Sequence, residues 1–152
     1  KVVNTILGGY FGSRLMTNIR EEKGLTYGIG SGLRSLQQDG YFLIGADVKK
    51  ENTSETLREI EKEIYRLMEE DVPEKKIKMV QNYLTGQLLA QADTPFALIE
   101  HFKSVYLFGL DYTYYEDYLE AINGISPEKI KELCRKYFNP EAMLTVVVGG
   151  NN

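Results

Sequence analysis

The first twenty residues carry an apolar side chain at every fourth position, a spacing that places side chains on one face of an α-helix. These positions are Val3, Leu7, Phe11, Leu15 and Ile19. The pattern predicts one long buried helix. Gly8, Gly9 and Gly12 oppose it, because each glycine costs about 1 kcal/mol relative to alanine inside a helix. Gly8 and Gly12 fall on one helical face, so we expect that face to approach another backbone closely.

A glycine and a pair of strand-like segments follow this helix. Gly24 suits a helix C-cap in the left-handed conformation, with Lys23 beside the negative end of the helix dipole. Residues 26–34 and 40–48, joined by the polar segment 35–39, predict an antiparallel hairpin. In the second strand the even-numbered residues from Phe42 onward form a strongly apolar face.

The remaining pattern predicts helices and one more strand. The helices are expected over about 53–70, 73–92, 96–108, 115–122 and 127–137, with an interruption at 93–95 and a strand over 142–148. Asn52, with Glu55 three residues later, suits an N-cap, and Ser126 before Pro127 is a second cap.

These elements predict an α+β fold in which an antiparallel or mixed β-sheet is covered by helices. A chain of 152 residues has the size of a single domain, which we take to span 1–152. Three strands give too little sheet for so many apolar helix faces, and the first helix opens without a visible cap. We therefore expect the domain to be truncated at its N-terminal end, with strands missing before Lys1 and a sheet edge open to pairing or self-association.

Composition excludes several classes of partner. The net charge is −4, and Lys and Arg alternate with Glu instead of forming a basic stripe, so nucleic acid is not an expected partner. No apolar run reaches the roughly 18 to 20 residues that a membrane-spanning helix needs. We expect a soluble domain, and its compartment stays open between a bacterial cytoplasm and periplasm.

Candidate residues for metal binding or nucleophilic catalysis are scarce. His101 is the only histidine, so the H-E-x-x-H and H-x-x-E-H zinc motifs are absent, and we expect neither a metal site nor a cofactor in this chain. Cys134 is the only cysteine and occupies an apolar helix position, which favours a buried, unreactive thiol. The glycines at 8–12 lack the Lys-Ser/Thr ending of a phosphate-binding loop, so packing explains them better.

One cluster of residues is more specific than a packing pattern. It comprises Leu7-Gly8-Gly9, Ser13-Arg14-Leu15, the run from Arg20 to Tyr27 and Ser31. This cluster resembles the second, non-zinc domain of the insulinase/pitrilysin-type zinc metallopeptidases, the inverzincins. Asn4, Gly40-Tyr41-Phe42 and the ending Val148-Gly149-Gly150 match as well, so the resemblance covers essentially the whole chain.

The resemblance implies a fold and a site. In that family two homologous α+β halves face one another like a clamshell, each a two-layer sandwich, and the first half holds zinc with H-x-x-E-H. The second half places an arginine and a tyrosine beside the zinc, and Arg20 and Tyr27 match those positions. Both side chains can donate hydrogen bonds to a peptide carbonyl and to a developing oxyanion. The structural alternative is that Arg20 pairs with Glu21 or Glu22 and that Tyr27 only packs.

Three hypotheses for function follow. The first is the substrate-binding, non-zinc half of a peptide-hydrolysing zinc metallopeptidase, which binds peptide, needs a zinc-bearing domain or subunit as partner and is inactive alone. The second is a non-catalytic scaffold or chaperone-like subunit with the same fold. The third, a free-standing binding module for peptides or small molecules, needs a pocket within this chain, and no sequence feature points to one.

Overall fold

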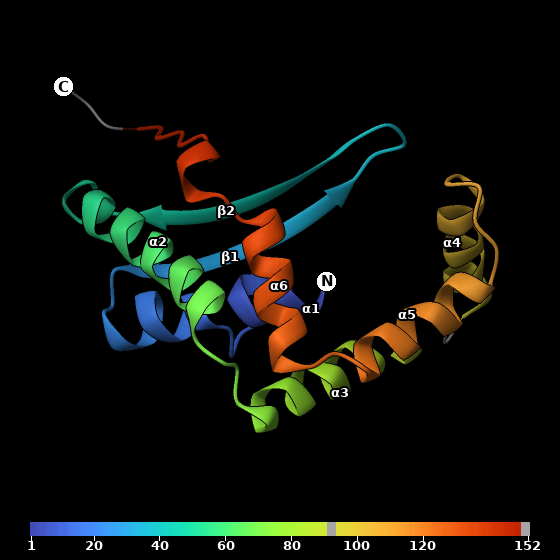
Figure 1. Ribbon diagram of the computed structural model, residues 1–152. Helices are drawn as coiled ribbons and strands as arrows, with labels where there is room; N and C mark the ends of the chain where they lie inside the picture. Colours follow the sequence, from blue (N-terminus) through green and yellow to red (C-terminus); the bar gives the residue numbers. More distant parts are fainter. Residues whose placement is uncertain (91–93, 150–152) are drawn as a thin grey trace.

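The computed structural model describes residues 1–90 and 94–149 and confirms the α+β class, with a two-stranded sheet and helices that pack against it (Figure 1). The elements are α1 (Val2–Asn4), η1 (Thr5–Gly9), η2 (Met16–Glu22), β1 (Thr26–Ser35), β2 (Gly40–Val48), η3 (Lys50–Asn52), α2 (Thr53–Glu69), α3 (Glu74–Ala90), α4 (Pro95–Tyr106), α5 (Thr113–Asn123), α6 (Pro127–Tyr137) and η4 (Pro140–Ala142).

The predicted hairpin is confirmed. Strands β1 and β2 pair antiparallel, with Ser35 opposite Gly40 at the turn. The Leu36 N–H donates to the Asp39 carbonyl at 2.8 Å, which closes the connection. Phe42 and Ile44 are half-buried against the core, as expected for the apolar face of the second strand.

The long N-terminal helix is not continuous, so this prediction is wrong. The segments α1 and η1 are followed by an extended residue, Tyr10 (φ −155°, ψ 171°), and η2 begins only at Met16. Both η1 and η2 are π-helical, with wider turns than an α-helix. The break falls among the glycines at 8, 9 and 12, where helix propensity is lowest. It turns Phe11 away from the core, and 63% of its surface is exposed.

Gly8 makes the close backbone approach that the sequence predicts. A Cβ on Gly8 would lie 2.6 Å from Ser31 Oγ and 2.7 Å from the Ser31 backbone N. Gly12 does not share this role, because it lies in the break and its nearest neighbour is the Tyr10 ring. Gly24 has φ +62°, which confirms the predicted left-handed cap.

The helices after the hairpin lie close to their predicted ranges. Ser126 Oγ accepts a hydrogen bond from the Lys129 N–H at 3.2 Å, which confirms that cap. Asn52 makes no side-chain cap; its amide donates instead to the Leu25 carbonyl at 3.2 Å and ties η3 to the start of β1. The predicted interruption at Asp93 and the predicted helix end at 91–92 lie outside the described residues.

The predicted final strand over 142–148 is wrong for this chain. After η4, residues 143–149 run without strand structure, and Leu144 and Val148 are 89% and 91% exposed. Their β-branched composition favours a strand, but a strand also needs a hydrogen-bonding neighbour. None of the segments within 1–90 and 94–149 pairs with them.

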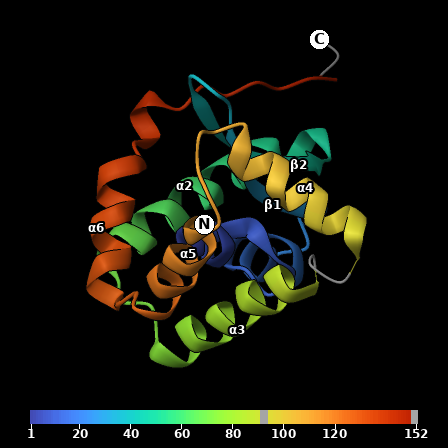
Figure 2. The same ribbon diagram turned by 90° about the vertical axis from the view of Figure 1, so that its right-hand side faces the viewer.

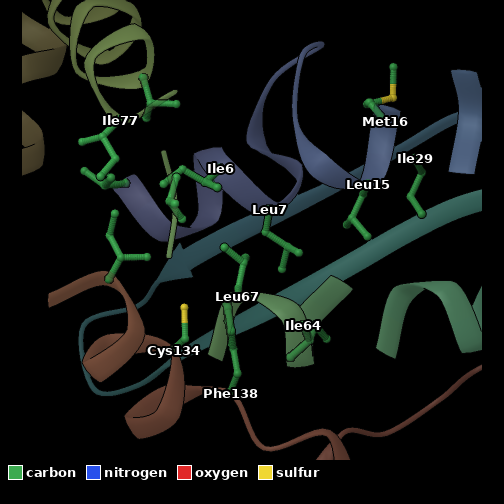
Figure 3. Close-up of a cluster of buried hydrophobic side chains, with 14 of the residues drawn as sticks. Ile6, Leu7, Leu15, Met16, Ile29, Ile64, Leu67, Ile77, Cys134 and Phe138 are labelled. Carbon is green, nitrogen blue, oxygen red and sulfur yellow. The ribbon is translucent and has the colours of Figure 1, made fainter. Parts of the chain in front are cut away.

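The core forms where the N-terminal segment meets the hairpin, α2 and α6 (Figure 3). Figure 2 shows this segment at the centre, with α3, α5 and α6 around it. The fully buried side chains include Ile6, Leu7, Leu15, Ile19, Ile64, Leu67, Ile130 and Cys134. Burial raises the pKa of the Cys134 thiol to about 11, which agrees with the unreactive cysteine expected from the sequence.

Candidate functional site

A tight turn between η2 and β1 positions Arg20 and Tyr27. Arg20 lies in the last turn of η2, and Tyr27 is the second residue of β1. Between them, Gly24 reverses the chain in the left-handed conformation, and the Leu25 N–H donates to the Ile19 carbonyl at 3.0 Å. The two side chains therefore project from the same end of the domain.

The Arg20 side chain has no polar partner among the residues that the structure describes. Its guanidinium carbon lies 5.5 Å from the centroid of the Tyr27 ring, within the range of a cation–π contact. The guanidinium makes neither an ion pair nor a hydrogen bond with Glu21, Glu22 or any other described residue. Its N–H donors are thus available to a ligand. The alternative interpretation, an ion pair of Arg20 with Glu21 or Glu22, does not agree with the structure.

Tyr27 lies on a β-bulge that the sequence does not reveal. Thr26 faces Val48 and Ile29 faces Ala46, so two residues of β1 oppose one residue of β2 in the interval between these pairs. Thr26 Oγ1 accepts from the Gly28 N–H at 3.1 Å and donates to the Asp47 carbonyl at 2.5 Å. Bulges redirect side chains out of the regular alternation. Tyr27 is 91% exposed, so it does not pack into the core.

Phe11 joins these two residues, although the sequence pattern places it on a buried helix face. The Arg20 guanidinium carbon lies 4.8 Å from the centroid of the Phe11 ring, closer than to Tyr27. The available signal was the position of Phe11 between Gly9 and Gly12, where a helix is least stable. Three side chains from separate parts of the fold therefore meet at one exposed surface.

Contacts with α3 fix the loop that carries Phe11. The Tyr10 ring lies 5.2 Å from the Tyr83 ring, and the Tyr10 hydroxyl donates to the Met79 sulfur at 3.7 Å. Lys76 Nζ donates to the Gly12 carbonyl and lies 5.1 Å from the Tyr10 ring centroid. The loop is thus held from both sides of Phe11.

A buried polar cluster anchors η2 beneath the site. The carboxylate of Glu63, 1% exposed, accepts hydrogen bonds from Asn18 at 2.8 Å and from Arg66 at 2.9 Å. Arg14 Nη1 lies 3.9 Å from the other Glu63 oxygen. Burial lowers the pKa of the Arg14 guanidinium, and the nearby Glu63 charge partly opposes this effect. Arg14 therefore supports η2 and does not project into the site.

The described residues do not fit a zinc site. No group of three or more His, Cys, Asp or Glu side chains within 1–90 and 94–149 is placed to hold a metal ion. His101, on α4, contacts the Tyr115 ring with centroids 5.2 Å apart. It lines a hollow of about 620 Å³ at α4 and α5 that includes none of Phe11, Arg20 and Tyr27.

Comparisons with known proteins agree on one family. The family model described as the peptidase M16 inactive domain matches residues 1–84, more than half of the chain. An uncharacterized zinc protease of Rickettsia bellii is 30% identical over 148 residues, which cover 97% of this chain and 35% of the relative. The uncharacterized zinc protease YmxG of Bacillus subtilis is 23% identical over 152 residues, 99% of this chain and 37% of the relative. The chain thus spans about a third of the length of these relatives.

Solved structures show the same fold. A peptidase M16 inactive domain from Pseudomonas fluorescens superposes with a TM-score of 0.82 at 26% identity, over 91% of this chain and 33% of that one. A chain of complex III from Candida albicans has a TM-score of 0.70 at 18% identity, over 90% of this chain and 34% of that one, and shows likeness of fold alone. No helix in the described part of the chain is both long and apolar enough to cross a bilayer. The resemblance to a non-zinc peptidase domain is confirmed, and the chain belongs to the family of peptidase M16 inactive domains.

Proposed function

We propose that this chain is the substrate-binding half of a zinc metallopeptidase and that it hydrolyses no peptide by itself. The observation that carries the proposal is the pair Arg20 and Tyr27, which project from one turn with hydrogen-bond donors that no described residue uses. The zinc-protease relatives and the absence of a metal-binding cluster in 1–90 and 94–149 support it. The metal chemistry would come from a homologous zinc-bearing domain or subunit.

The chemistry of the pair suits a peptide backbone. A guanidinium carries five N–H donors and a phenol one O–H donor, so together they can bind carbonyl oxygens of an extended peptide. When a carbonyl is attacked, its oxygen gains negative charge, and fixed donors aimed at that oxygen stabilise it. Arg20 would hold the backbone of the peptide, and Tyr27 would support the oxygen where charge develops.

A non-catalytic scaffold of the same fold is the competing function. A scaffold has no chemical need for a half-buried arginine and an exposed tyrosine that lack polar partners among the described residues, whereas a peptide-binding surface uses both. An H-x-x-E-H motif in the rest of the parent protein would favour the peptidase, and its absence there would favour the scaffold.

The test compares Tyr27→Phe and Arg20→Ala in the full-length parent protein. Tyr27→Phe removes one hydroxyl and keeps the ring, so we expect turnover to fall by up to about a hundredfold, less if a zinc ion shares the oxyanion charge. Arg20→Ala should raise KM, because it removes donors to the bound peptide. Peptide hydrolysis and thermal unfolding are measured side by side, and the unfolding temperatures should barely change.

Matched controls separate chemistry from stability. Tyr106→Phe alters a tyrosine that is 68% exposed on α4, and Arg58→Ala alters an exposed arginine on α2. Both controls should keep wild-type kinetics. If Tyr27→Phe and Arg20→Ala are fully active, or if unfolding accounts for their loss, the scaffold becomes the better function.

A further inference from the structure

We propose that Phe11 is a positioning residue for Arg20: its ring holds the guanidinium in place so that the N–H donors stay directed toward a bound peptide. The inference rests on the proposed function of Arg20. It adds a third residue to the peptide-binding surface, one that acts through Arg20 and not on the peptide.

The contacts of Arg20 carry the argument. The guanidinium carbon lies 4.8 Å from the centroid of the Phe11 ring and 5.5 Å from that of Tyr27, and these are the contacts that hold it in the part of the chain that the structure describes. An arginine without a polar partner samples many rotamers and loses that freedom when it binds. Aromatic contacts restrict the side chain without occupying its donors.

Stacking is the arrangement that leaves an arginine ready to bind. A guanidinium is planar, and its N–H groups point outward in that plane. When its face lies over an aromatic ring, the donors remain free at the edge for a peptide carbonyl. A carboxylate partner, by contrast, would occupy the same donors that the peptide needs.

The loop that carries Phe11 is held by contacts other than the one with Arg20. The loop on its N-terminal side is held by Tyr10 against Tyr83, and on its C-terminal side by the hydrogen bond from Lys76 to the Gly12 carbonyl. Phe11 itself is 63% exposed and lies outside the buried core cluster. An exposed phenylalanine on an anchored loop gains little from burial, so packing does not explain why an aromatic side chain is present there, whereas a contact with Arg20 does.

The test is a double-mutant cycle in the full-length parent protein. Phe11→Leu keeps an apolar side chain but removes the ring, and Phe11→Tyr restores an aromatic face. Each is made in the wild-type and in the Arg20→Ala background, with Phe96→Leu, at an 81% exposed position of α4, as the matched control. The readouts are kcat and KM for a peptide substrate, and the affinity of a fluorescently labelled peptide for the zinc-stripped protein.

We expect Phe11→Leu to raise KM and peptide Kd about 2- to 5-fold with kcat nearly unchanged, the range for an exposed cation–π contact. Phe11→Tyr should restore both values. In the Arg20→Ala background Phe11→Leu should change nothing further, because the side chain on which Phe11 acts is gone. A structural role would give the same loss in both backgrounds.

The outcomes separate this inference from the function on which it rests. If Arg20→Ala weakens peptide binding but Phe11→Leu has no effect, or has an equal effect in both backgrounds, the positioning role is overturned and the proposed function stands. If Arg20→Ala itself leaves peptide binding and hydrolysis unchanged, both the positioning role of Phe11 and the proposed function are overturned. If Phe11→Leu lowers the unfolding temperature, Phe11→Met replaces it in the same cycle, with the same expected results.

Discussion

Gly8 lies where the N-terminal segment crosses β1, and its missing side chain sets how closely the two can approach. A Cβ there would meet Ser31 Oγ at 2.6 Å and the Ser31 backbone N at 2.7 Å. The backbone of a paired strand cannot move away easily. We expect Gly8→Ala to destabilise the protein by about 1–3 kcal/mol, the cost of overpacking, despite the better helix propensity of alanine. Urea unfolding measures the change.

Gly86 offers the matched control for this prediction. It lies inside α3, and a Cβ there would meet no described atom within 4 Å apart from the adjoining backbone of its own helix. Gly86→Ala should therefore be neutral or stabilise by up to about 1 kcal/mol, because alanine loses less entropy in a helix. If Gly8→Ala proves as harmless as Gly86→Ala, the close approach does not limit the fold.

The residues of the candidate site differ in how far the sequence predicts them. Arg20 and Tyr27 belong to a motif, and Gly24 predicts the turn between them. Their position at the same end of the domain therefore follows from local helix-capping preferences. Phe11 continues a four-residue apolar repeat, and periodicity alone assigns it to the core. Its exposure depends on the break in the helix, and the broken segment is held by Tyr83 and Lys76, residues distant in sequence.

At the scale of elements, the packing of η2 on α2 depends on a buried carboxylate. Glu63 accepts from Asn18 and Arg66 and lies 3.9 Å from Arg14. Its removal takes one hydrogen bond from each of the first two side chains and leaves the guanidinium of Arg14, a side chain that is 15% exposed, without the carboxylate that faces it. We expect Glu63→Ala to cost about 3 kcal/mol or more. Thermal and urea unfolding of the variant measure this loss.

The control for this prediction is an ion pair on the surface. Glu132 pairs with Lys129 at 2.7 Å within α6 and is 62% exposed, so Glu132→Ala should cost less than about 1 kcal/mol. Equal losses for Glu63→Ala and Glu132→Ala would mean that the buried cluster contributes no more than a solvated pair.

Elements with local signals are predicted well, and those that need a distant partner are not. The helix α6 follows from Ser126-Pro127 and its apolar spacing, and the hairpin from two strands joined by a short polar segment. Segment 142–148 has strand composition, yet composition cannot supply the neighbour with which a strand must pair. The bulge at Tyr27 cannot be predicted from β1 alone for the same reason, because the register is defined by the pairing of two strands.

Within residues 1–90 and 94–149 the molecule presents a two-stranded sheet and, beyond α6, an exposed apolar segment, 143–149. In this segment Leu144, Val146 and Val148 are between 73% and 91% exposed. Contiguous exposure of large apolar side chains to water is unfavourable. Because the relatives are about three times as long as this chain, we propose that the full-length protein contributes strands that complete the sheet and convert this segment into a paired strand.

Hydrogen exchange tests this proposal, since paired strand amides exchange slowly and exposed extended ones exchange fast. We expect the amides of 143–148 to exchange fast in the 152-residue chain and slowly in the full-length protein, whereas the amides of α6 should be protected in both. Val146→Lys should lower the unfolding temperature of the full-length protein, because it buries a charge in the completed sheet, and should leave that of the short chain unchanged, where Val146 is 73% exposed. Fast exchange of 143–148 in both proteins would show that the segment stays unpaired and that the sheet is not completed there.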